Sequence, residues 1–501
     1  MERKTKLALN SASSLAYQIT TIVCGFILPR FFLTYYGSQV NGLVSSITQF
    51  LGFITLAECG VGAVVQASLY KPLAEKDMVS VSKVIKSSER FFRRIAWLLA
   101  GYSVILMAVY PLITIESFDY LFTLSLIFVI SISSFAQYYL GMTYKLLLDA
   151  DQLGFIQYTI QAVALILNTV LCVLLMRCGA SVQAVKLTTS MIFVLQPVLL
   201  SIIAKRRYMI DHKIQITGEP IQQKWNALMH HISGVVLNNT DTVVLTLFST
   251  LENVSIYAVY HLVVNGVKQI VISMTNGVRA MFGNMLAKNE TEGLLRAFDR
   301  IEWLLHTLVT FVFSVTGVLI VPFVRVYTAS VTDADYIVPA FAYMITLSQA
   351  AYCYRLPYYI LVNAAGHYKQ TQWSAIIESV INVVVSVLLV FRFGLIGVAI
   401  GTFVAMMYRT IYLVWYLKKE ILYRKMRHFI KHVIVDVCGA GLLFSLVSLF
   451  PSMLALQRLD YLAWIVLAVK VAVAGAVALG FINVLFYWKE MSSSHFTRKK
   501  I

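Results

Sequence analysis

The chain has 501 residues, of which 59% are hydrophobic and only 13% are charged. A water-soluble protein of this size needs far more charged side chains to cover its surface, so the composition excludes a soluble enzyme or regulator. The formal net charge of +17 would suit nucleic acid, but most basic residues lie in segments beside apolar runs, such as 83–94 and 418–431. Anionic membrane lipids are therefore the expected partners of these residues, and nucleic acid is not.

Apolar runs long enough to cross about 30 Å of hydrocarbon contain about 20 residues each, and about fourteen such runs can be placed along the chain. In chain order, the predicted spans cover residues 8–33, 41–69, 95–113, 120–144, 154–176, 181–204, 226–250, 255–284, 303–325, 336–363, 371–391, 394–417, 430–450 and 461–487. The sequence thus predicts an all-α integral membrane protein.

The connecting segments predict the orientation. An even number of spans places both termini on one side, and the segments on that side hold most of the Lys and Arg residues, so both termini are expected in the cytoplasm. The outer segments are too short to hold a catalytic domain. The six cysteines lack metal-ligand spacing, and the sequence has no phosphate-binding loop, so neither a metal site nor a cofactor is predicted.

An internal repeat divides the chain. The pattern Tyr-x-x-Leu-x-x-Ala at Tyr144 returns at Tyr358, and Arg-Ile-x-Trp-Leu-Leu at Arg94 returns at Arg300. A repeat of this length in an apolar chain is typical of transporters built from two related halves. The predicted domains are an N-terminal lobe of six spans over 1–214, a C-terminal lobe of six spans over 215–428, and a terminal helix pair with a cytoplasmic tail over 429–501.

Two longer inner segments, 79–94 and 288–302, are amphipathic and lead into the two Arg-Ile-x-Trp copies. Both are expected to lie along the inner membrane interface. Anchoring of the neighbouring spans explains them adequately, and a role in gating is left open.

Ionisable side chains inside spans are the strongest functional signals, because each costs about 2.5 to 3.5 kcal/mol at the bilayer centre. The acids are Glu58, Asp241, Glu378 and Asp436, and the bases are Arg30, Lys186, Lys268, Arg279, Arg355, Arg409 and Lys470. Asp436 and Arg409 are expected to reach toward the inner interface, and Lys470 lies in the terminal pair, so no transport role is predicted for these three. His230, His231 and His306 are expected to be hydrogen-bonded packing groups.

Several spans combine polar residues on one face. In a continuous helix over 255–284, Lys268 and Arg279 would lie about three turns apart, within about 20° of one face, with Asn265 close to it. Span seven has Asn238 and Asp241 on a similar face, and span two has Glu58. These faces are expected to line a cavity between the halves. The alternative is that Asp241 with Lys268, or Glu58 with a base, forms a buried pair that fixes helix packing.

The sign of these charges separates two kinds of substrate. The bases Arg30, Lys268, Arg279 and Arg355 outnumber the nearby acids, which suits a phosphate or diphosphate because Arg makes forked hydrogen bonds to phosphate oxygens. The carboxylates of Glu58, Asp241 and Glu378 are then candidates to tune the charge or to carry coupling protons or sodium ions, and the sequence does not choose between these ions.

Three segments near the N-terminus carry a family resemblance. They are Pro29-Arg30 with Gly37 seven residues later, Leu56-Ala-Glu58-Cys-Gly60, and Tyr70-Lys-Pro-Leu-Ala-Glu75. This opening resembles that of Wzx-type polysaccharide flippases, which belong to the multidrug/oligosaccharidyl-lipid/polysaccharide exporter superfamily. The resemblance implies a V-shaped pair of six-helix lobes that rock between two states, with spans one, two, seven and eight facing the cavity. The resemblance extends diffusely over nearly the whole chain.

The function implied by this resemblance is transport of an undecaprenyl-diphosphate-linked oligosaccharide to the outer leaflet of the bacterial cytoplasmic membrane, for cell-surface polysaccharide synthesis alongside other glycan-assembly proteins. We expect ion-coupled alternating access, with the substrate held by the predicted set Arg30, Lys268, Arg279, Arg355, Asn238 and Asn265. The alternatives are a cation or drug antiporter of the same superfamily, a glycan polymerase, which the short outer segments disfavour, and a scaffold, which would have no use for the buried charges.

Overall fold

The computed structural model describes residues 3–58, 61–208, 210–211, 228–275, 278–451, 456 and 458–496. These residues form α-helices and two short segments of 3₁₀- and π-helix, and no strand occurs among them. Eleven helices of the described part are long and apolar enough to cross a membrane. The expected all-α, multi-span membrane fold is confirmed.

Contacts divide the chain into two compact units, Met1–Leu247 and Phe248–Ile501. The first ends later than the predicted lobe 1–214, because α8 (Leu228–Phe248) is tied to α1 and the segment after it. The hydroxyls of Ser46 and Thr246 lie 2.7 Å apart, and Nε2 of His231 lies 2.7 Å from the carbonyl oxygen of Thr55. The division into lobes over 1–214 and 215–428 with a terminal part over 429–501 stays a prediction.

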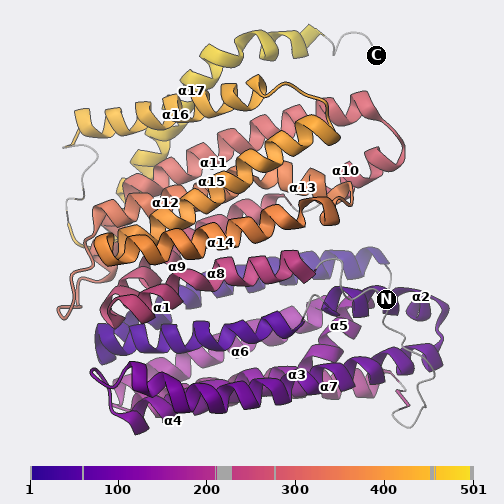
Figure 1. Ribbon diagram of the computed structural model, residues 1–501, viewed down its shortest axis with the longest axis vertical. Helices are drawn as coiled ribbons and strands as arrows, with labels where there is room; N and C mark the ends of the chain where they lie inside the picture. The colour runs from indigo at the N-terminus through magenta and orange to yellow at the C-terminus, as the bar shows by residue number, and fades with distance from the viewer. Residues whose placement is uncertain are drawn as a thin grey trace. The chain divides into compact units, whose positions relative to one another are not determined.

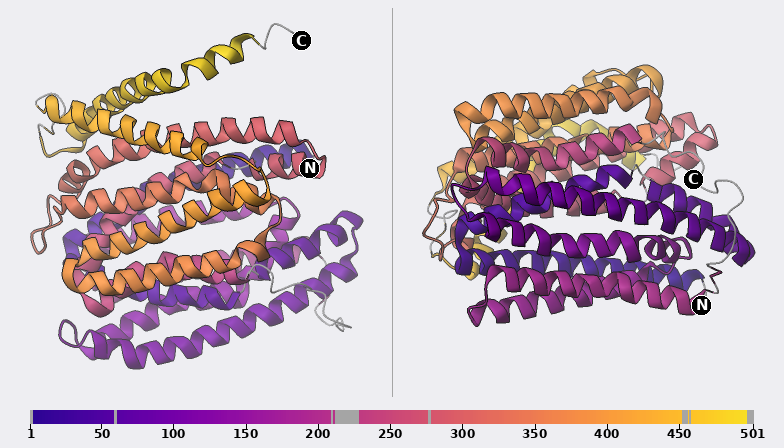
Figure 2. Two further views of the ribbon diagram at one scale, coloured as in Figure 1. Left: turned by 45° about the horizontal axis from the view of Figure 1, so that its top comes forward. Right: turned by 60° about the horizontal axis from the view of Figure 1, so that its bottom comes forward.

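Unit 1 is a bundle in which α6 packs on α1 and α4 packs on both α3 and α7 (Figures 1 and 2). Besides α8, its elements are α1 (Arg3–Gly52), η1 (Phe53–Glu58), α2 (Val61–Glu75), α3 (Met78–Ile113), α4 (Tyr120–Ala136), η2 (Gln137–Gly141), α5 (Met142–Ala150), α6 (Gly154–Arg177) and α7 (Val182–Arg207).

Unit 2 is built around the pair α14 and α15, with α12 against α15 and with α16 and α17 against α11 (Figure 1). Its elements are α9 (Leu251–Met274), α10 (Val278–Ala287), α11 (Thr291–Tyr327), α12 (Pro339–Tyr354), α13 (Leu356–Ala364), α14 (Tyr368–Phe393), α15 (Leu395–Glu420), α16 (Arg427–Leu449) and α17 (Tyr461–Phe496).

The second predicted span differs from the structure, whereas its separation from the first does not. The label α1 covers two helices that meet at a kink at Gly37, inside the expected connection, where φ 81° and ψ 174° are not helical. Glycine adopts this positive φ without the penalty that a Cβ atom would bring. The helix then ends at Gly52, and a 3₁₀ segment carries Glu58. The prediction of one continuous helix over 41–69, with Glu58 on its polar face, is therefore wrong.

The predicted span 255–284 is also interrupted. Helix α9 ends at Met274 with Thr275 as its C-cap, and α10 begins at Val278. Lys268 and Arg279 thus lie on different helices, and the angular argument that placed them on one face does not apply. The prediction of a shared Lys268 and Arg279 stripe is wrong.

The two amphipathic segments are the first turns of long helices. Helix α3 runs without a break from Met78, capped by the Asp77 side chain, to Ile113, and its 36 residues extend about 54 Å at 1.5 Å per residue. Helix α11 is likewise continuous over 37 residues. The expected separate interfacial helices are therefore not formed, because each segment continues the helix that follows it.

The close contact of α14 and α15 depends on glycine. A Cβ atom on Gly401 of α15 would lie 2.7 Å from the backbone nitrogen of Ser386 in α14, whereas one on Gly441 of α16 would meet no atom within 4 Å. We expect Gly401→Ala to lower the stability of the full chain by about 1 to 3 kcal/mol. Thermal unfolding in detergent measures this, with Gly441→Ala as the control. Equal unfolding temperatures for the two variants would contradict the close contact.

Candidate functional site

Two of the predicted bases in unit 2 lie against one half-buried tyrosine ring, that of Tyr352. Tyr352 lies in the last turn of α12. The ammonium nitrogen of Lys268, from α9, is 5.1 Å from the centre of this ring, and the guanidinium carbon of Arg355 is 4.2 Å from it. Both bases are buried, with 7% and 8% of their surface exposed. Aromatic faces attract cations at these distances, and more strongly where water is excluded.

The break between α12 and α13 positions Arg355. Helix α12 ends at Tyr354 and α13 starts at Leu356, with Pro357 in its first turn. Proline has no N–H to donate and is favoured at a helix start, so the chain begins a new helix here. Arg355 stands at the junction and its carbonyl accepts from the N–H of Tyr359 at 2.9 Å. Its backbone is thereby fixed between the end of α12 and the start of α13.

Arg355 continues into a buried group of charges. Its guanidinium is bonded to the Glu378 carboxylate of α14, and Nε of Arg409, from α15, lies 3.8 Å from the other oxygen of Glu378. Arg409 also donates to the carbonyl oxygen of Thr371 at 2.9 Å and to the hydroxyl of Ser374. Arg409 is only 2% exposed. The expectation that Arg409 reaches out toward the interface is wrong, because these bonds hold it inside the unit.

We call Lys268, Tyr352, Arg355, Glu378 and Arg409 the cationic cluster. The guanidinium groups of Arg355 and Arg409 share the carboxylate of Glu378, and Lys268 lies with Arg355 on the Tyr352 ring. The side chains come from four helices and one helix junction. Two buried guanidinium groups on one carboxylate leave a net positive charge, which an anionic group would offset. The arrangement is suited to holding an anionic group, with two guanidinium forks and one ammonium as donors.

The structure brings together Lys268, Arg355 and Glu378 of the predicted site but places Arg279 elsewhere. Arg279 is exposed, donates to the hydroxyl of Tyr368 at the start of α14, and has its guanidinium carbon 5.9 Å from that ring centre. Asn265 is half-buried on α9, one turn before Lys268.

The remaining predicted residues belong to unit 1. Arg30 is half-buried in α1, Asn238 is exposed on α8, and Asp241 is buried on α8. The Glu58 carboxylate accepts from the hydroxyl of Tyr138, which lies in the π-helical turn η2. The prediction that Glu58 forms a buried pair with a base differs from this contact, which is a hydrogen bond to a phenol.

A second group of titratable residues contains Glu302, which the sequence argument did not name, together with His306 and Asp436, which it named separately. In the repeat, Arg-Ile-Ala-Trp-Leu-Leu-Ala ends at Ala100, whereas the second copy places Glu302 and His306 at the two alanine positions. Both side chains are buried. Asp436, expected to reach the interface, is also buried and lies 2.6 Å from Nδ1 of His306. The interface placement of Asp436 is therefore wrong.

No protein-family model matches the sequence, and no curated protein matches it. Solved structures do match. The lipid II flippase MurJ, in an inward closed conformation, has a TM-score of 0.70 at 15% identity, and the match covers 97% of this chain and 100% of that one. An inward-facing multidrug resistance MATE family transporter of the MOP superfamily has a TM-score of 0.57 at 13% identity, covering 84% of this chain and 100% of that one. The eukaryotic MATE transporter AtDTX14 has a TM-score of 0.53 at 13% identity, covering 85% and 99%. This multi-pass membrane protein therefore has the fold shared by MurJ and the MATE transporters.

Proposed function

We propose that this protein is a secondary transporter that moves an undecaprenyl-diphosphate-linked oligosaccharide from the cytoplasmic to the outer leaflet of the bacterial cytoplasmic membrane. The observation that carries the proposal is the cationic cluster, in which two buried guanidinium groups share a single carboxylate and the buried Lys268 lies on the adjoining tyrosine ring. The fold supports it, because the flippase MurJ aligns with 97% of this chain. We further propose alternating access, coupled to an ion, with both termini in the cytoplasm.

The chemistry of the cluster matches a diphosphate. Arg355 can offer two parallel N–H donors to one phosphate group, and the ammonium of Lys268, on the same tyrosine ring, serves the next. Glu378 then orients the guanidinium of Arg355 and offsets part of the charge of the two guanidinium groups that it contacts. In this proposal Asn265, Asn238, Arg30 and Arg279 contact the sugars or the rest of the headgroup. Glu58 and Asp241 tune the charge or hold the coupling ion.

A cation or drug antiporter is the second candidate, because MATE transporters share the fold. A cavity that attracts organic cations needs an excess of acids, and the cationic cluster has the opposite balance. Transport of a cationic dye by proteoliposomes under an ion gradient, without competition from undecaprenyl diphosphate, would favour this candidate.

Binding of undecaprenyl diphosphate to the purified full chain tests the proposal. We expect Lys268→Ala to weaken binding at least about tenfold, since a hydrogen bond to a charged group contributes about 1.5 to 3 kcal/mol. Arg355→Lys, which keeps the charge beside Glu378 but loses the fork, should weaken it similarly. Native mass spectrometry with undecaprenyl monophosphate as the comparison ligand provides the measurement.

Lys470→Ala is the matched control, because Lys470 is an exposed lysine of α17. It should bind as the wild type does. Unchanged binding in both Lys268→Ala and Arg355→Lys, at wild-type amounts of folded protein, would exclude the cationic cluster as the diphosphate site.

A further inference from the structure

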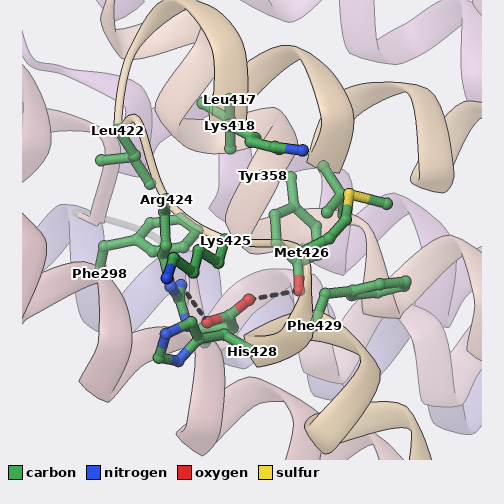
Figure 3. Close-up of a pocket in the computed structure, with 12 residues that line it drawn as sticks. Phe298, Tyr358, Leu417, Lys418, Leu422, Arg424, Lys425, Met426, His428 and Phe429 are labelled. Carbon is green, nitrogen blue, oxygen red and sulfur yellow. Dashed lines mark hydrogen bonds and ion pairs between the residues drawn. The ribbon is translucent and has the colours of Figure 1, made fainter.

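A chain of buried hydrogen bonds runs through unit 2, apart from the cationic cluster, and starts at a small cavity. The cavity measures about 20 Å³ and is lined by Glu302, Tyr358, Arg424 and His428, among others (Figure 3). This volume holds about one water molecule. The hydroxyl of Tyr358 donates to Oε1 of Glu302 at 2.6 Å, and Arg424 is ion-paired with Oε2, as the dashed lines of Figure 3 show.

The series of hydrogen bonds continues from Tyr358 to Asp436. Nε2 of His306 lies 3.0 Å from the Tyr358 hydroxyl oxygen, and Nδ1 of His306 lies 2.6 Å from Oδ2 of Asp436. The Thr310 hydroxyl donates to Oδ1 of Asp436 at 2.6 Å. All these side chains except Asp436 come from α11 and α13, whereas Asp436 lies on α16. These hydrogen bonds thus connect α16, in the terminal helix pair, to the rest of unit 2.

A count of the hydrogen-bond donors places an additional proton on the His306 and Asp436 pair. Glu302 is ion-paired with Arg424, so it is a carboxylate and can only accept. The single proton of the Tyr358 hydroxyl is therefore used toward Glu302, and Nε2 of His306 must be the donor to the Tyr358 oxygen. Between Nδ1 of His306 and the Asp436 carboxyl there must then be a second proton, either on the imidazole or on the acid. His306 and Asp436 together hold one proton more than neutral histidine beside a carboxylate.

The charged neighbours do not remove this requirement. Among the residues that the structure describes, no Arg or Lys lies within ion-pair distance of Asp436. Arg424 pairs with Glu302 and also lies 3.2 Å from Asp299. Five other titratable groups surround these hydrogen bonds. His432 lies 3.4 Å from Glu302 and stacks on His306, and the Tyr487 hydroxyl lies 2.6 Å from Nδ1 of His432, with Lys431 over the Tyr487 ring. The Tyr354 hydroxyl lies 2.9 Å from Oγ1 of Thr310, and His428 lines the cavity.

We propose that the His306 and Asp436 pair is a proton-binding site, filled and emptied through Tyr358 and Glu302 from the cavity. On release, the Nε2 proton of His306 passes to the Tyr358 oxygen while the Tyr358 hydroxyl proton passes to Glu302. Glu302 then gives this proton to water in the cavity. One proton leaves, Asp436 becomes a carboxylate beside neutral His306, and the uncompensated charge disfavours the packing of α16 on α11.

Coupling of this site to transport rests on the proposed function, whereas proton binding itself does not. The repeat supplies an internal comparison. In unit 1 the hydroxyl of Tyr144 donates to Oε1 of Glu89 at 2.6 Å, and Arg93 lies 3.7 Å from the other oxygen of Glu89. The position that corresponds to His306 is Ala100. Unit 1 therefore also has a bond between this tyrosine and a glutamate, at a different position of the repeat, without the histidine that would extend it.

Solid-state NMR of the full chain with ¹⁵N-labelled histidine tests the proton site directly. In the wild type at neutral pH, we expect both ring nitrogens of His306 to show bonded protons, or one proton shared with Asp436. In Asp436→Asn, His306 should become a neutral tautomer, while the His367 signals, from a ring bonded to Tyr416, should not move. Unchanged His306 signals in Asp436→Asn would overturn the proposal. If Asp436→Asn does not fold, Tyr358→Phe, which keeps the ring, is used, and it should shift the Nε2 signal.

Proteoliposomes test the coupling. The probe is a fluorescent undecaprenyl-diphosphate-linked saccharide. A gradient of one pH unit changes the equilibrium ratio of the probe between the two leaflets about tenfold if one proton is coupled to each transport step. The wild type should flip the probe faster under this gradient, Tyr358→Phe should lose the acceleration, and Tyr144→Phe should keep it. Acceleration retained in Tyr358→Phe would contradict the proton path. Failure of the wild type to bind the probe would count against the proposed function and leave the NMR result to decide the proton site.

Discussion

Glu378→Ala should lower the stability of the chain by about 3 to 5 kcal/mol, because it leaves the two buried guanidinium groups of Arg355 and Arg409 without their carboxylate. Each of these bases is at most 8% exposed, so water cannot replace the lost acid. Thermal unfolding of the full chain in detergent, followed by size-exclusion chromatography, measures the loss. Much of the variant should already aggregate at temperatures where the wild type is intact.

The control for Glu378→Ala is Glu116→Ala, at an exposed acid in the connection after α3, and it should unfold as the wild type does. The double variant Glu378→Gln with Arg355→Met should recover part of the loss, since removing both members of a buried pair costs less than removing one. Wild-type stability of Glu378→Ala would show that Arg355 and Arg409 do not depend on this acid.

Tyr110→Ala should destabilise unit 1 by about 3 to 5 kcal/mol, the usual cost of deleting a buried aromatic ring. Tyr110 is fully buried on α3, and its ring centre is 5.3 Å from that of Phe50. Its hydroxyl donates to Oγ of Ser46 at 2.7 Å, and Ser46 in turn contacts Thr246 of α8. The variant removes both the packing of α3 on α1 and the hydrogen bond that leads to α8.

Tyr110→Phe separates the two contributions, because it deletes only the hydroxyl and should cost about 0.5 to 1.5 kcal/mol. Hydrogen exchange of α8 gives a local readout, and both variants should expose its amides near Thr246 more than the wild type does. A larger loss of stability in Tyr110→Phe than in Tyr110→Ala would contradict this account of the packing.

Hydropathy predicted the long helices well and their interruptions poorly. The runs 154–176 and 181–204 coincide closely with α6 and α7, because an apolar segment that must satisfy its own backbone in lipid becomes a helix. The breaks after Gly52 and Met274 fall inside equally apolar stretches. Hydropathy carries no information about a change of backbone direction. The polar faces predicted for continuous helices over 41–69 and 255–284 were therefore wrong.

The sequence identified members of the site but not their arrangement. Lys268, Arg355 and Glu378 stand out because charge inside a membrane span requires a reason. Their meeting at Tyr352 depends on how α9, α12 and α14 cross, and no local pattern contains that information. Arg409 was assigned to the interface from its distance to the span end, although the Ser374 and Thr371 oxygens of a neighbouring helix hold it inside.

The repeat contains a signal for Glu302 and His306 that the sequence argument did not use. Comparing the two Arg-Ile-x-Trp copies residue by residue shows Ala96 replaced by Glu302 and Ala100 by His306, one helical turn apart. The two copies share their Arg, Ile, Trp and Leu residues. Glu302 and His306 are therefore differences within an otherwise repeated pattern. The contact of His306 with Asp436 could not be foreseen, because α16 has no counterpart in the first half.

The hydrogen bonds between α8 and the rest of unit 1 also have a consequence for synthesis of the protein. Domains emerging from a ribosome fold largely in the order of their appearance. Ser46, which accepts from the Tyr110 hydroxyl, reaches its contact with Thr246 only once α8 has been made. Unit 1 is therefore completed only after residue 246 has been synthesised, and a chain arrested shortly after α7 would present an unfinished bundle to the insertion machinery.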